Sequence, residues 1–378
     1  MTKTGRCWTA AFGLTLMTAA CGTSDATDTG REVTPIERTP VSQNEFTAVE
    51  IEATIDELVT EINKSSIEPM QMAVLLKSLN SFFAPIATGA SRAVGELGAA
   101  GRVTGNVLGP TDASAGHEEA MGLQTQQIKQ MVADGAEGIV ITPFGEGNVD
   151  VIKEAVADGI PVVTLDTDLT TSNRQIYVGT ISDTAGRAAG ETLLGMLPEG
   201  PGTVLIHGWV DETWVDGVER TKGARKVFEA AGYDVLVHPV IYDDEEKDVD
   251  VMKKEIEAAD PPVVGLIGLF NDSYRCVMGA DAAGAPDLPI VTFDFDPKTA
   301  DYMRQGRIKA THVQRQYYAG YLGPYIAYGI KSLDLDATRK ILARQMIDDS
   351  RFDLGVYVVP AGKVNEFNDF LDEIGATQ

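Results

Sequence analysis

The amino-acid sequence predicts an α/β protein with two doubly wound lobes, each built on a parallel sheet. The first observation is that, from Met70 onward, short apolar runs alternate with segments of helical periodicity. The second is that these runs are apolar throughout, which is typical of parallel strands covered by helices on both faces. The third is that about ten such runs are more than one compact sheet of this chain length usually holds. Two lobes therefore fit the pattern better than one.

An amphipathic helix comes first, over residues 48–67, where apolar residues from Ile51 to Ile62 recur at helical spacing. The predicted strands follow at residues 71–76, 104–108, 138–143, 161–166, 175–179, 203–207, 234–240, 263–269, 290–294 and 310–313. Helical patterns such as residues 115–133 and 183–197 lie between them. Strands that are joined through helices in this way run parallel to one another.

Residues 1–20 have the features of an export signal peptide. Lys3 and Arg6 precede an apolar core that is too short to span a membrane as a mature helix. The core ends at Ala19-Ala20-Cys21, which resembles a bacterial lipobox and implies lipidation of Cys21; a plain secretory signal cut near Ala20 is the alternative. Residues 21–47 are rich in Thr, Ser, Asp, Glu and Pro and lack periodicity, which predicts a flexible tether.

Composition excludes several classes of function. The formal net charge of −25, without a basic cluster, repels nucleic acids and anionic lipid surfaces. We therefore expect no nucleic-acid partner, and contact with a membrane only through the lipid anchor. Cys276 lies in an apolar helical run and is predicted to pack in the core. The 4 histidines are scattered without the spacing of metal ligands, so no metal and no cofactor is predicted.

Polar and aromatic side chains follow the predicted strands at their carboxyl ends, where sheets of this class bind ligands. Ser78-Leu79-Asn80-Ser81-Phe82-Phe83 follows the first strand, Thr142 ends the third, and Asp166-Thr167-Asp168 follows the fourth. Later strands are followed by Asn271, Asp294 and Gln314. These strand ends contain no Ser-His-Asp set, no Cys-His pair and no intact phosphate loop. They offer hydrogen-bonding groups and ring faces rather than a nucleophile.

One motif raises the possibility of an enzyme. The stretch Asp166-Thr167-Asp168-Leu169-Thr170 reads D-x-D-x-T and resembles the nucleophile loop of haloacid-dehalogenase phosphatases, in which the two carboxylates act with Mg²⁺. That motif should open its sheet, whereas here several predicted strands precede it. A phosphatase would also leave Asn80, Arg220 and Gln314 without a role. We therefore expect that the protein is not an enzyme.

The strand ends together resemble the periplasmic sugar-binding proteins of the ribose/galactose type, the ligand-binding subunits of ABC importers. The similarity covers roughly residues 70–370. Its markers, in family order, are Ser78-Leu79-Asn80-Ser81-Phe82-Phe83, Gly159-Ile160-Pro161-Val162-Val163-Thr164-Leu165-Asp166, Glu219-Arg220-Thr221-Lys222-Gly223, Phe270-Asn271-Asp272, Val291-Thr292-Phe293-Asp294 and Ala310-Thr311-His312-Val313-Gln314. Where ribose binders place an Arg after the strand-end Asp, this chain has Thr167, which looks closer to relatives that bind deoxyhexoses or other small polyols.

The resemblance implies the type I periplasmic binding protein fold, with two lobes joined by three crossings of the chain. These crossings are expected near Gly179-Thr180, Gln314-Arg315 and about Ala343. The N-terminal lobe would then comprise residues 68–179 plus 315–342, and the C-terminal lobe residues 180–314 plus 343–378.

The resemblance also implies the ligand site. The residues that match the family's ligand contacts are Asn80, Phe82, Phe83, Asp166, Arg220, Asn271, Asp294 and Gln314, and further candidates are Thr142, Asp168 and Trp214. Carboxylates, amides and guanidinium groups engage vicinal hydroxyls two at a time, and aromatic faces cover the C–H surface of a sugar ring.

The function implied is that of an exported lipoprotein, periplasmic or at the cell surface. It would act as a monomer, capture a monosaccharide or similar small polyol between closing lobes, and deliver it to an ABC permease. A sugar-sensing lipoprotein that signals to a membrane receptor is the alternative. A transcription regulator shares the fold but would need a helix-turn-helix before the first strand, where an export signal and an acidic tether stand instead.

Overall fold

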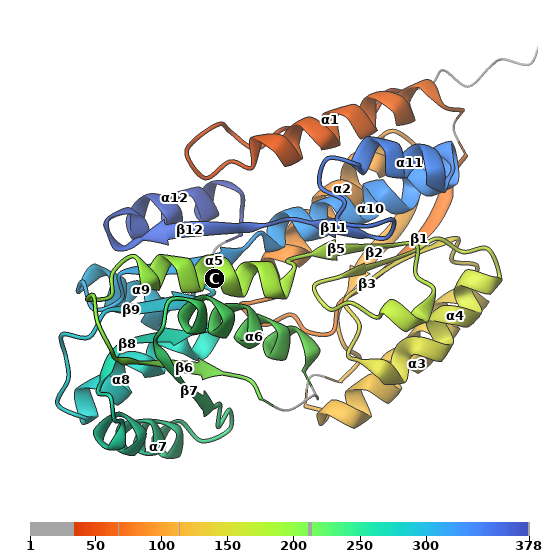
Figure 1. Cartoon of the computed structure of the whole chain (residues 1–378). Helices are drawn as coiled ribbons and strands as arrows, with labels where there is room; N and C mark the ends of the chain where they lie inside the picture. The colour runs from red at the N-terminus through yellow and green to blue at the C-terminus, as the bar shows by residue number, and fades with distance from the viewer. Residues whose placement is uncertain (1–33, 67, 113, 211–213, 377–378) are drawn as a thin grey trace, which may run out of the picture. The chain divides into compact units, whose positions relative to one another are not determined.

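The computed structural model describes residues 34–66, 68–112, 114–210 and 214–376 (Figure 1). The predicted signal peptide, the predicted lipidation residue Cys21 and the first part of the predicted tether lie outside these residues. None of the helices in the described part of the chain has the length and apolar character needed to cross a membrane.

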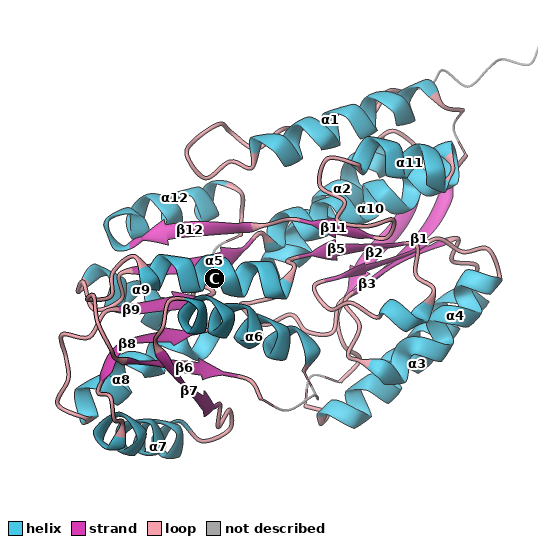
Figure 2. Cartoon of the chain, in the orientation of Figure 1, coloured by secondary structure: helices cyan, strands magenta, loops and turns pink. Residues whose placement is uncertain are grey.

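Two six-stranded sheets form the framework, which confirms the predicted fold class (Figure 2). The first sheet has the order β11-β5-β4-β3-β1-β2, and all of its paired strands are parallel. Its strands are β1 (Met70–Leu75), β2 (Val103–Leu108), β3 (Gly138–Ile141), β4 (Val162–Leu165), β5 (Ile176–Gly179) and β11 (Arg351–Asp353). The lobe built on this sheet is called the first lobe below.

The second sheet has the order β12-β10-β9-β8-β6-β7. It is parallel except at its edge, where β12 runs antiparallel to β10. Its strands are β6 (Thr203–Gly208), β7 (Asp234–Pro239), β8 (Val263–Gly268), β9 (Ile290–Phe293), β10 (Ala310–Gln314) and β12 (Val356–Pro360). The lobe built on it is called the second lobe.

Helices cover both faces of each sheet, because strands that are apolar on both sides must be buried on both sides. The first lobe carries α2 (Ala84–Ala99), α3 (His117–Ala133), α4 (Val149–Ala157), α10 (Gln316–Leu333) and α11 (Leu335–Leu342). The second lobe carries α5 (Ser182–Leu194), α6 (Val215–Ala230), α7 (Glu245–Ala258), α8 (Arg275–Ala282), α9 (Pro297–Arg304) and α12 (Val364–Glu373). Short 3-10 helices are η1 (Glu146–Asn148), η2 (Thr170–Ser172), η3 (Asn271–Tyr274) and η4 (Ala361–Lys363).

The expected position of the third crossing, near Ala343, is wrong. Strand β11 pairs with β5 in the first sheet, so the chain stays with the first lobe through Asp353 and passes to β12 at Leu354-Gly355. The strand escaped sequence analysis because it is three residues long and Phe352 is its one fully buried member. Gly355 has φ +64°, a left-handed conformation that glycine adopts without strain and that lets the chain turn here.

The predicted flexible tether is also wrong for its described part, residues 34–47. Ile36, Val41 and Phe46 are buried in the main hydrophobic core, with exposed fractions of 5%, 6% and 7%. The segment is also pinned by polar contacts, because the Ile36 amide donates to Asn63 and Arg92 donates to the Thr39 carbonyl. The apolar residues are too widely spaced to show periodicity, so the polar composition around them concealed a packed segment. We call residues 34–48 the N-terminal strap.

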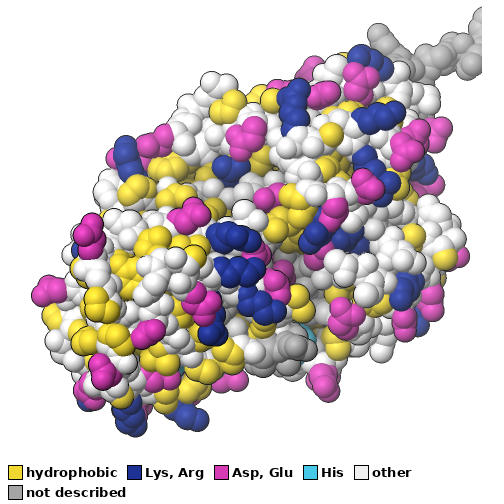
Figure 3. Space-filling view, viewed as in Figure 1, with side chains coloured by type: hydrophobic (Ala, Val, Ile, Leu, Met, Phe, Trp, Pro, Cys, Tyr) yellow, Lys and Arg dark blue, Asp and Glu magenta, His cyan; other side chains and the backbone are white. Residues whose placement is uncertain are grey.

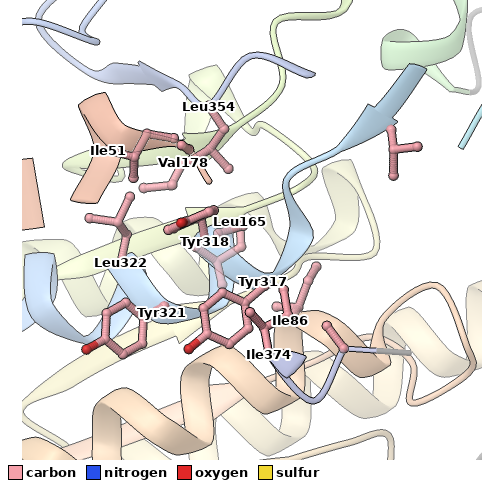
Figure 4. Packing of buried hydrophobic residues seen from close by; sticks show 14 of the residues in the cluster. Ile51, Ile86, Leu165, Val178, Tyr317, Tyr318, Tyr321, Leu322, Leu354 and Ile374 are labelled. Atoms are coloured by element: carbon pink, nitrogen blue, oxygen red, sulfur yellow. The ribbon is translucent and has the colours of Figure 1, made fainter. Parts of the chain in front are cut away.

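Helix α1 (Val49–Lys64) continues the strap and packs against α10 and α11 (Figure 1). Its apolar stripe includes Ile51, which lies close to Val178 and Leu354 and above the aromatic rings of α10 in Figure 4. Phe46, just before the helix, packs edge-on to Phe367 of α12 at 5.0 Å between ring centroids. The strap and α1 therefore contact helices of both lobes.

Candidate functional site

A cavity of about 290 Å³ lies between the two lobes at the carboxyl ends of their strands. Its walls include every residue that sequence analysis assigned to the main ligand site, namely Asn80, Phe82, Phe83, Asp166, Arg220, Asn271, Asp294 and Gln314. Trp214, one of the further candidates, also lines it. The strand-end argument thus brings residues from distant parts of the sequence to one place.

Two aspartates occupy matching positions in the two lobes. Asp166 follows β4 and Asp294 follows β9, and both have a left-handed backbone, with φ of 64° and 63°. Left-handed φ is uncommon for residues other than glycine, although aspartate tolerates it better than most. Strain of this kind persists where the surrounding structure imposes it, and it often marks functional positions. Here it occurs where each strand delivers a carboxylate to the cavity.

Lys77 supplies a positive charge on the first-lobe side of the cavity. Its ammonium group lies 3.1 Å from Asp166 Oδ2 and donates to Thr167 Oγ1 at 2.6 Å. It also lies 5.2 Å from the centre of the Phe83 ring. Lys77 follows β1 by two residues, and its side chain is one-fifth exposed, so it presents an ammonium group to the cavity while holding the Asp166 carboxylate in place.

Arg220 supplies the positive charge on the second-lobe side. Its guanidinium carbon lies 4.0 Å from the centre of the Phe293 ring, and Nη1 donates to the Leu269 carbonyl at 2.9 Å. The residue is 2% exposed, and its Nε is buried without a hydrogen-bond partner. A buried donor without a partner costs free energy, so a ligand oxygen that reached this group would be favoured.

The carboxyl groups of Asp294 and Asp216 both have raised pKa values. Burial raises the pKa of Asp294 to about 6, although Arg220 and the amide of Gln314, which donates to Asp294 Oδ1 at 3.1 Å, act in the opposite direction. Burial by the surrounding protein and the nearby charge of Asp166 raise the pKa of Asp216 to about 6, again against the effect of Arg220. Burial is the largest cause in both cases, so a hydroxyl group that donated to either carboxylate would favour its ionised form.

Aromatic rings form the remaining walls. Phe82 and Phe83 meet edge to face, with centroids 5.0 Å apart, and Phe83 is 7% exposed and belongs to the hydrophobic core. Phe82, which is partly buried, is therefore the better placed of the two to cover a ligand ring. Trp209 and Trp214 form a second edge-to-face pair, with centroids 5.1 Å apart, on the second lobe.

Two of the further candidates do not reach this cavity. Thr142 is fully buried, and its hydroxyl accepts from the Lys77 amide at 2.7 Å, so it stabilises the end of β1 instead. Asp168 accepts hydrogen bonds from Arg174 at both carboxylate oxygens, at 2.6 and 2.8 Å, and lies in a neighbouring part of the cleft. Asn80 reaches the cavity but also accepts from the Phe83 amide through Oδ1, as a helix cap would.

Several cavity residues were missed by sequence analysis. They are Lys77, Thr180, Ser182, Asp216, Tyr242 and Phe270. One signal could have found Asp216, because it lies four residues before Arg220 on α6 and therefore on the same face of that helix. Tyr242 lies in the connection after β7, where no strand-end marker pointed to it.

An outer cleft of about 710 Å³ adjoins the cavity and shares Lys77, Phe83, Trp209, Trp214 and Asp216 with it. Its own walls come from both lobes and include His117, Phe144, Asp168, Asp183 and Glu219. On the face of the molecule shown in Figure 3, acidic and basic side chains are interspersed. The cavity and the outer cleft are therefore neighbours that share part of their lining.

The structure also gathers histidines that looked unrelated in the sequence. His207 and His238 lie 2.8 and 3.0 Å from the two oxygens of Asp248, and Glu255 lies 2.6 Å from the other nitrogen of His238. The ligand atoms are close enough to hold a metal ion. However, Arg275 already places a guanidinium 3.3 Å from Asp248. Burial lowers the pKa of His238, but its hydrogen bonds to Asp248 and Glu255 outweigh this and raise the pKa to about 9. We interpret the group as an ion-pair network in the second lobe.

Comparison with known families gives one match that covers most of the chain. The family described as "Periplasmic binding protein domain" matches residues 72–332. Among curated proteins, the ribose import binding protein RbsB of Salmonella typhimurium is 23% identical over 260 residues, which cover 68% of this chain and 83% of that protein.

Solved structures share the fold. A sugar-binding protein of a sugar ABC transporter from Bacillus halodurans superimposes with a TM-score of 0.64 at 20% identity, over 79% of this chain and 99% of that one. An ABC transporter solute-binding protein from Burkholderia graminis, solved in complex with D-arabinose, gives a TM-score of 0.58 at 23% identity, over 79% of this chain and 97% of that one.

Proposed function

The chain belongs to the periplasmic binding protein family, and from this premise we propose that it captures a monosaccharide or similar small polyol between its two lobes for delivery to an ABC importer. One observation carries the proposal: Asn80, Asp166, Arg220, Asp294 and the other residues matched to the family's ligand contacts all line one cavity between the lobes. A site assembled from so many separate strand ends is difficult to explain as a set of unrelated helix caps.

The chemistry of the cavity suits a neutral polyhydroxylated ring. Asp166, Asp216 and Asp294 offer acceptors for hydroxyl protons, whereas Lys77 and Arg220 offer donors for hydroxyl oxygens. A hydroxyl group both donates and accepts, so it can use both sets at once. Phe82 and the tryptophans provide apolar faces for the C–H side of the ring.

The relatives support this class of ligand. The curated relative is named for ribose import, and the Burkholderia graminis structure contains D-arabinose. Thr167 stands after Asp166 where ribose binders are expected to have an arginine, so this cavity departs from the pattern expected of a ribose binder. We therefore propose a ligand other than D-ribose.

The phosphatase interpretation is the weaker alternative. In that interpretation both Asp166 and Asp168 would face the reacting phosphate. Asp168 is instead engaged by Arg174 through both carboxylate oxygens, and Asp166 is engaged by Lys77. The relatives found are binding proteins, which favours binding over catalysis for this chain.

Delivery to a permease and signalling to a membrane receptor would use the same closed state of the lobes. The relatives favour delivery, because they are named as components of importers and ABC transporters. We propose that the protein acts as a monomer. A pull-down of the sugar-loaded protein with detergent-solubilised membranes would separate the alternatives, since either a permease or a sensor would be recovered.

A thermal-shift screen of monosaccharides and polyols on residues 34–378 tests the proposed function. A ligand present at about 100 times its Kd adds roughly 2.7 kcal/mol to the free energy of unfolding, which for a chain of this size raises Tm by about 4 °C. The panel should contain D-ribose, D-arabinose, D-galactose, D-fucose and myo-inositol. If no member of a wider panel of sugars and polyols raises Tm, the proposal fails.

Binding should weaken in acid. Sugar hydroxyls donate to ionised Asp216 and Asp294, whose pKa values are about 6 in the free protein, so binding favours the ionised forms and lowers both pKa values. Affinity is therefore expected to be full above about pH 7 and to fall as the pH drops below 6, by up to about tenfold per pH unit for each group. Calorimetric titrations from pH 5 to pH 8 measure this, and Asp294→Asn should flatten the profile. A wild-type affinity that stays constant from pH 5 to pH 8 would contradict the predicted loss of binding in acid.

Anchoring is proposed through Cys21, because Ala19-Ala20-Cys21 resembles a lipobox and the family's name implies an exported protein. Expressed at full length in bacteria, the protein is expected to sediment with membranes. Cys21→Ser should release it or leave the signal peptide attached, and the Cys7→Ser variant serves as the control that keeps the anchor. A wild-type protein that is fully soluble after processing would refute the lipid anchor.

A further inference from the structure

The space between the lobes is larger than one sugar ring requires. The cavity of about 290 Å³ is at the lower end of the range for ligand pockets, and the adjoining outer cleft of about 710 Å³ is more than twice as large. The two spaces share Lys77, Phe83, Trp209, Trp214 and Asp216 in their linings, so a ligand in one lies next to the other.

Aromatic pairs from both lobes line the outer cleft. His117 and Phe144 of the first lobe meet edge to face, with ring centroids 5.8 Å apart. Trp209 and Trp214 of the second lobe meet in the same way at 5.1 Å. The outer cleft therefore offers aromatic surface on both sides of a gap, as the inner cavity does with Phe82 and the tryptophans.

Among the five described acids that line the outer cleft, three form ion pairs, namely Asp168, Asp183 and Glu219. Asp168 is held by Arg174, with 2.6 Å between the nearest atoms, and Asp183 accepts from Lys226, also at 2.6 Å. Paired carboxylates still accept hydrogen bonds from hydroxyls but attract ionic groups only weakly. Aromatic side chains with mostly paired acids around them suit a second neutral sugar unit better than an anionic substituent.

We propose that the outer cleft is a second sugar subsite, so that the preferred ligand is a disaccharide or a glycoside. One ring occupies the inner cavity, and the second unit lies between the His117–Phe144 pair and the Trp209–Trp214 pair. This inference rests on the proposed function, since it assumes that the inner cavity binds a sugar.

The test compares sugars that share a ring. Calorimetric titrations use D-galactose against lactose and melibiose, D-glucose against cellobiose and maltose, and D-xylose against xylobiose. We expect at least one disaccharide to bind at least about tenfold more tightly than its parent monosaccharide, because the second unit adds apolar contact with the aromatic side chains of the outer cleft.

Variants locate the effect. His117→Ala and Phe144→Ala should each reduce the advantage of the disaccharide to less than about threefold and leave the affinity for the monosaccharide unchanged. His117 is exposed, so its replacement should not disturb folding. Glu118→Ala, an exposed neighbour on the same helix that does not line the cleft, is the matched control and should change neither affinity. Arg220→Ala should weaken both ligands alike.

Each remaining outcome counts against a specific claim. If monosaccharides bind and no disaccharide binds more tightly, the second subsite is wrong and the proposed function stands. If the advantage of the disaccharide survives both His117→Ala and Phe144→Ala, the subsite is not where we place it. If sugars of neither size bind, the proposed function fails, and this inference fails with it.

Discussion

Arg220→Ala is expected to lower the affinity for the sugar by about one to two orders of magnitude, because hydrogen bonds to charged groups contribute about 1.5–3 kcal/mol each. Arg220 is 2% exposed, and its guanidinium group lies over the face of the Phe293 ring, with Nε buried and without a hydrogen-bond partner in the protein. Truncation removes these donors and leaves ligand hydroxyls unpaired. Calorimetric titration with the sugar that gives the largest thermal shift measures the loss.

A control on the same helix makes the result specific. Arg225→Ala removes an exposed arginine of α6 that pairs with Glu229, so it should leave affinity within about twofold of the wild type, which is the scale of a surface ion pair. Equal losses in the two variants would show that Arg220 acts through the general charge of the helix rather than through the ligand.

The contributions of Asp166 and Arg220 to binding are expected to depend on each other. Asp166 belongs to the first lobe and Arg220 to the second, so a ligand that bridges them gains the second set of hydrogen bonds only when the lobes close. When one substitution already prevents closure, the hydrogen bonds that form only in the closed state are lost, so the second substitution removes fewer contacts with the ligand. The double variant Asp166→Ala/Arg220→Ala is therefore expected to lose less binding free energy than the sum of the single variants. Strictly additive losses would contradict closure around the ligand.

Phe46→Ala is expected to lower the free energy of unfolding by about 3–5 kcal/mol, the usual cost of removing a buried phenylalanine. Phe46 is 7% exposed and packs against Phe367 and Phe370 of α12, with ring centroids 5.0 and 5.9 Å away. The substitution would leave a gap between the N-terminal strap and the second lobe. Urea unfolding of residues 34–378 measures the change, as a shift of the unfolding midpoint between wild type and variant with an unchanged m value.

An exposed residue next to the strap provides the comparison. Val49, at the start of α1, is 53% exposed, so Val49→Ala should change the free energy of unfolding by less than about 0.5 kcal/mol. If Phe46→Ala is as stable as Val49→Ala, then residues 34–47 behave as the flexible tether that their composition suggested, and the packed strap is wrong.

Much of the framework could be predicted because parallel strands are buried on both faces and leave continuous apolar runs in the sequence. The runs that end at Leu165 and Phe293 are examples, and each is followed by an aspartate that the structure places at the cavity. The carboxyl ends of parallel strands meet at one edge of a sheet, so the strand ends predicted that residues such as Asp166 and Asp294 lie together. Arg220, on α6, came only from the resemblance to the family.

The elements that were missed depend on tertiary contacts that leave little local pattern. Strand β11 is too short to show periodicity and exists because it pairs with β5. Lys77 follows a strand end but was overlooked, since lysine side chains usually extend into solvent. The ion-pair network of His207, His238 and Asp248 joins residues from two strands and a helix, so no spacing in the sequence indicates it.

Small-angle X-ray scattering of residues 34–378, with and without the sugar selected by the thermal-shift screen, tests the central claim most directly. The claim is that a sugar is held between two lobes that close on it. The account predicts a smaller radius of gyration for the wild type at saturating sugar, and little change for Arg220→Ala under conditions that occupy the first lobe alone. A wild-type radius of gyration that stays the same at saturation would contradict it.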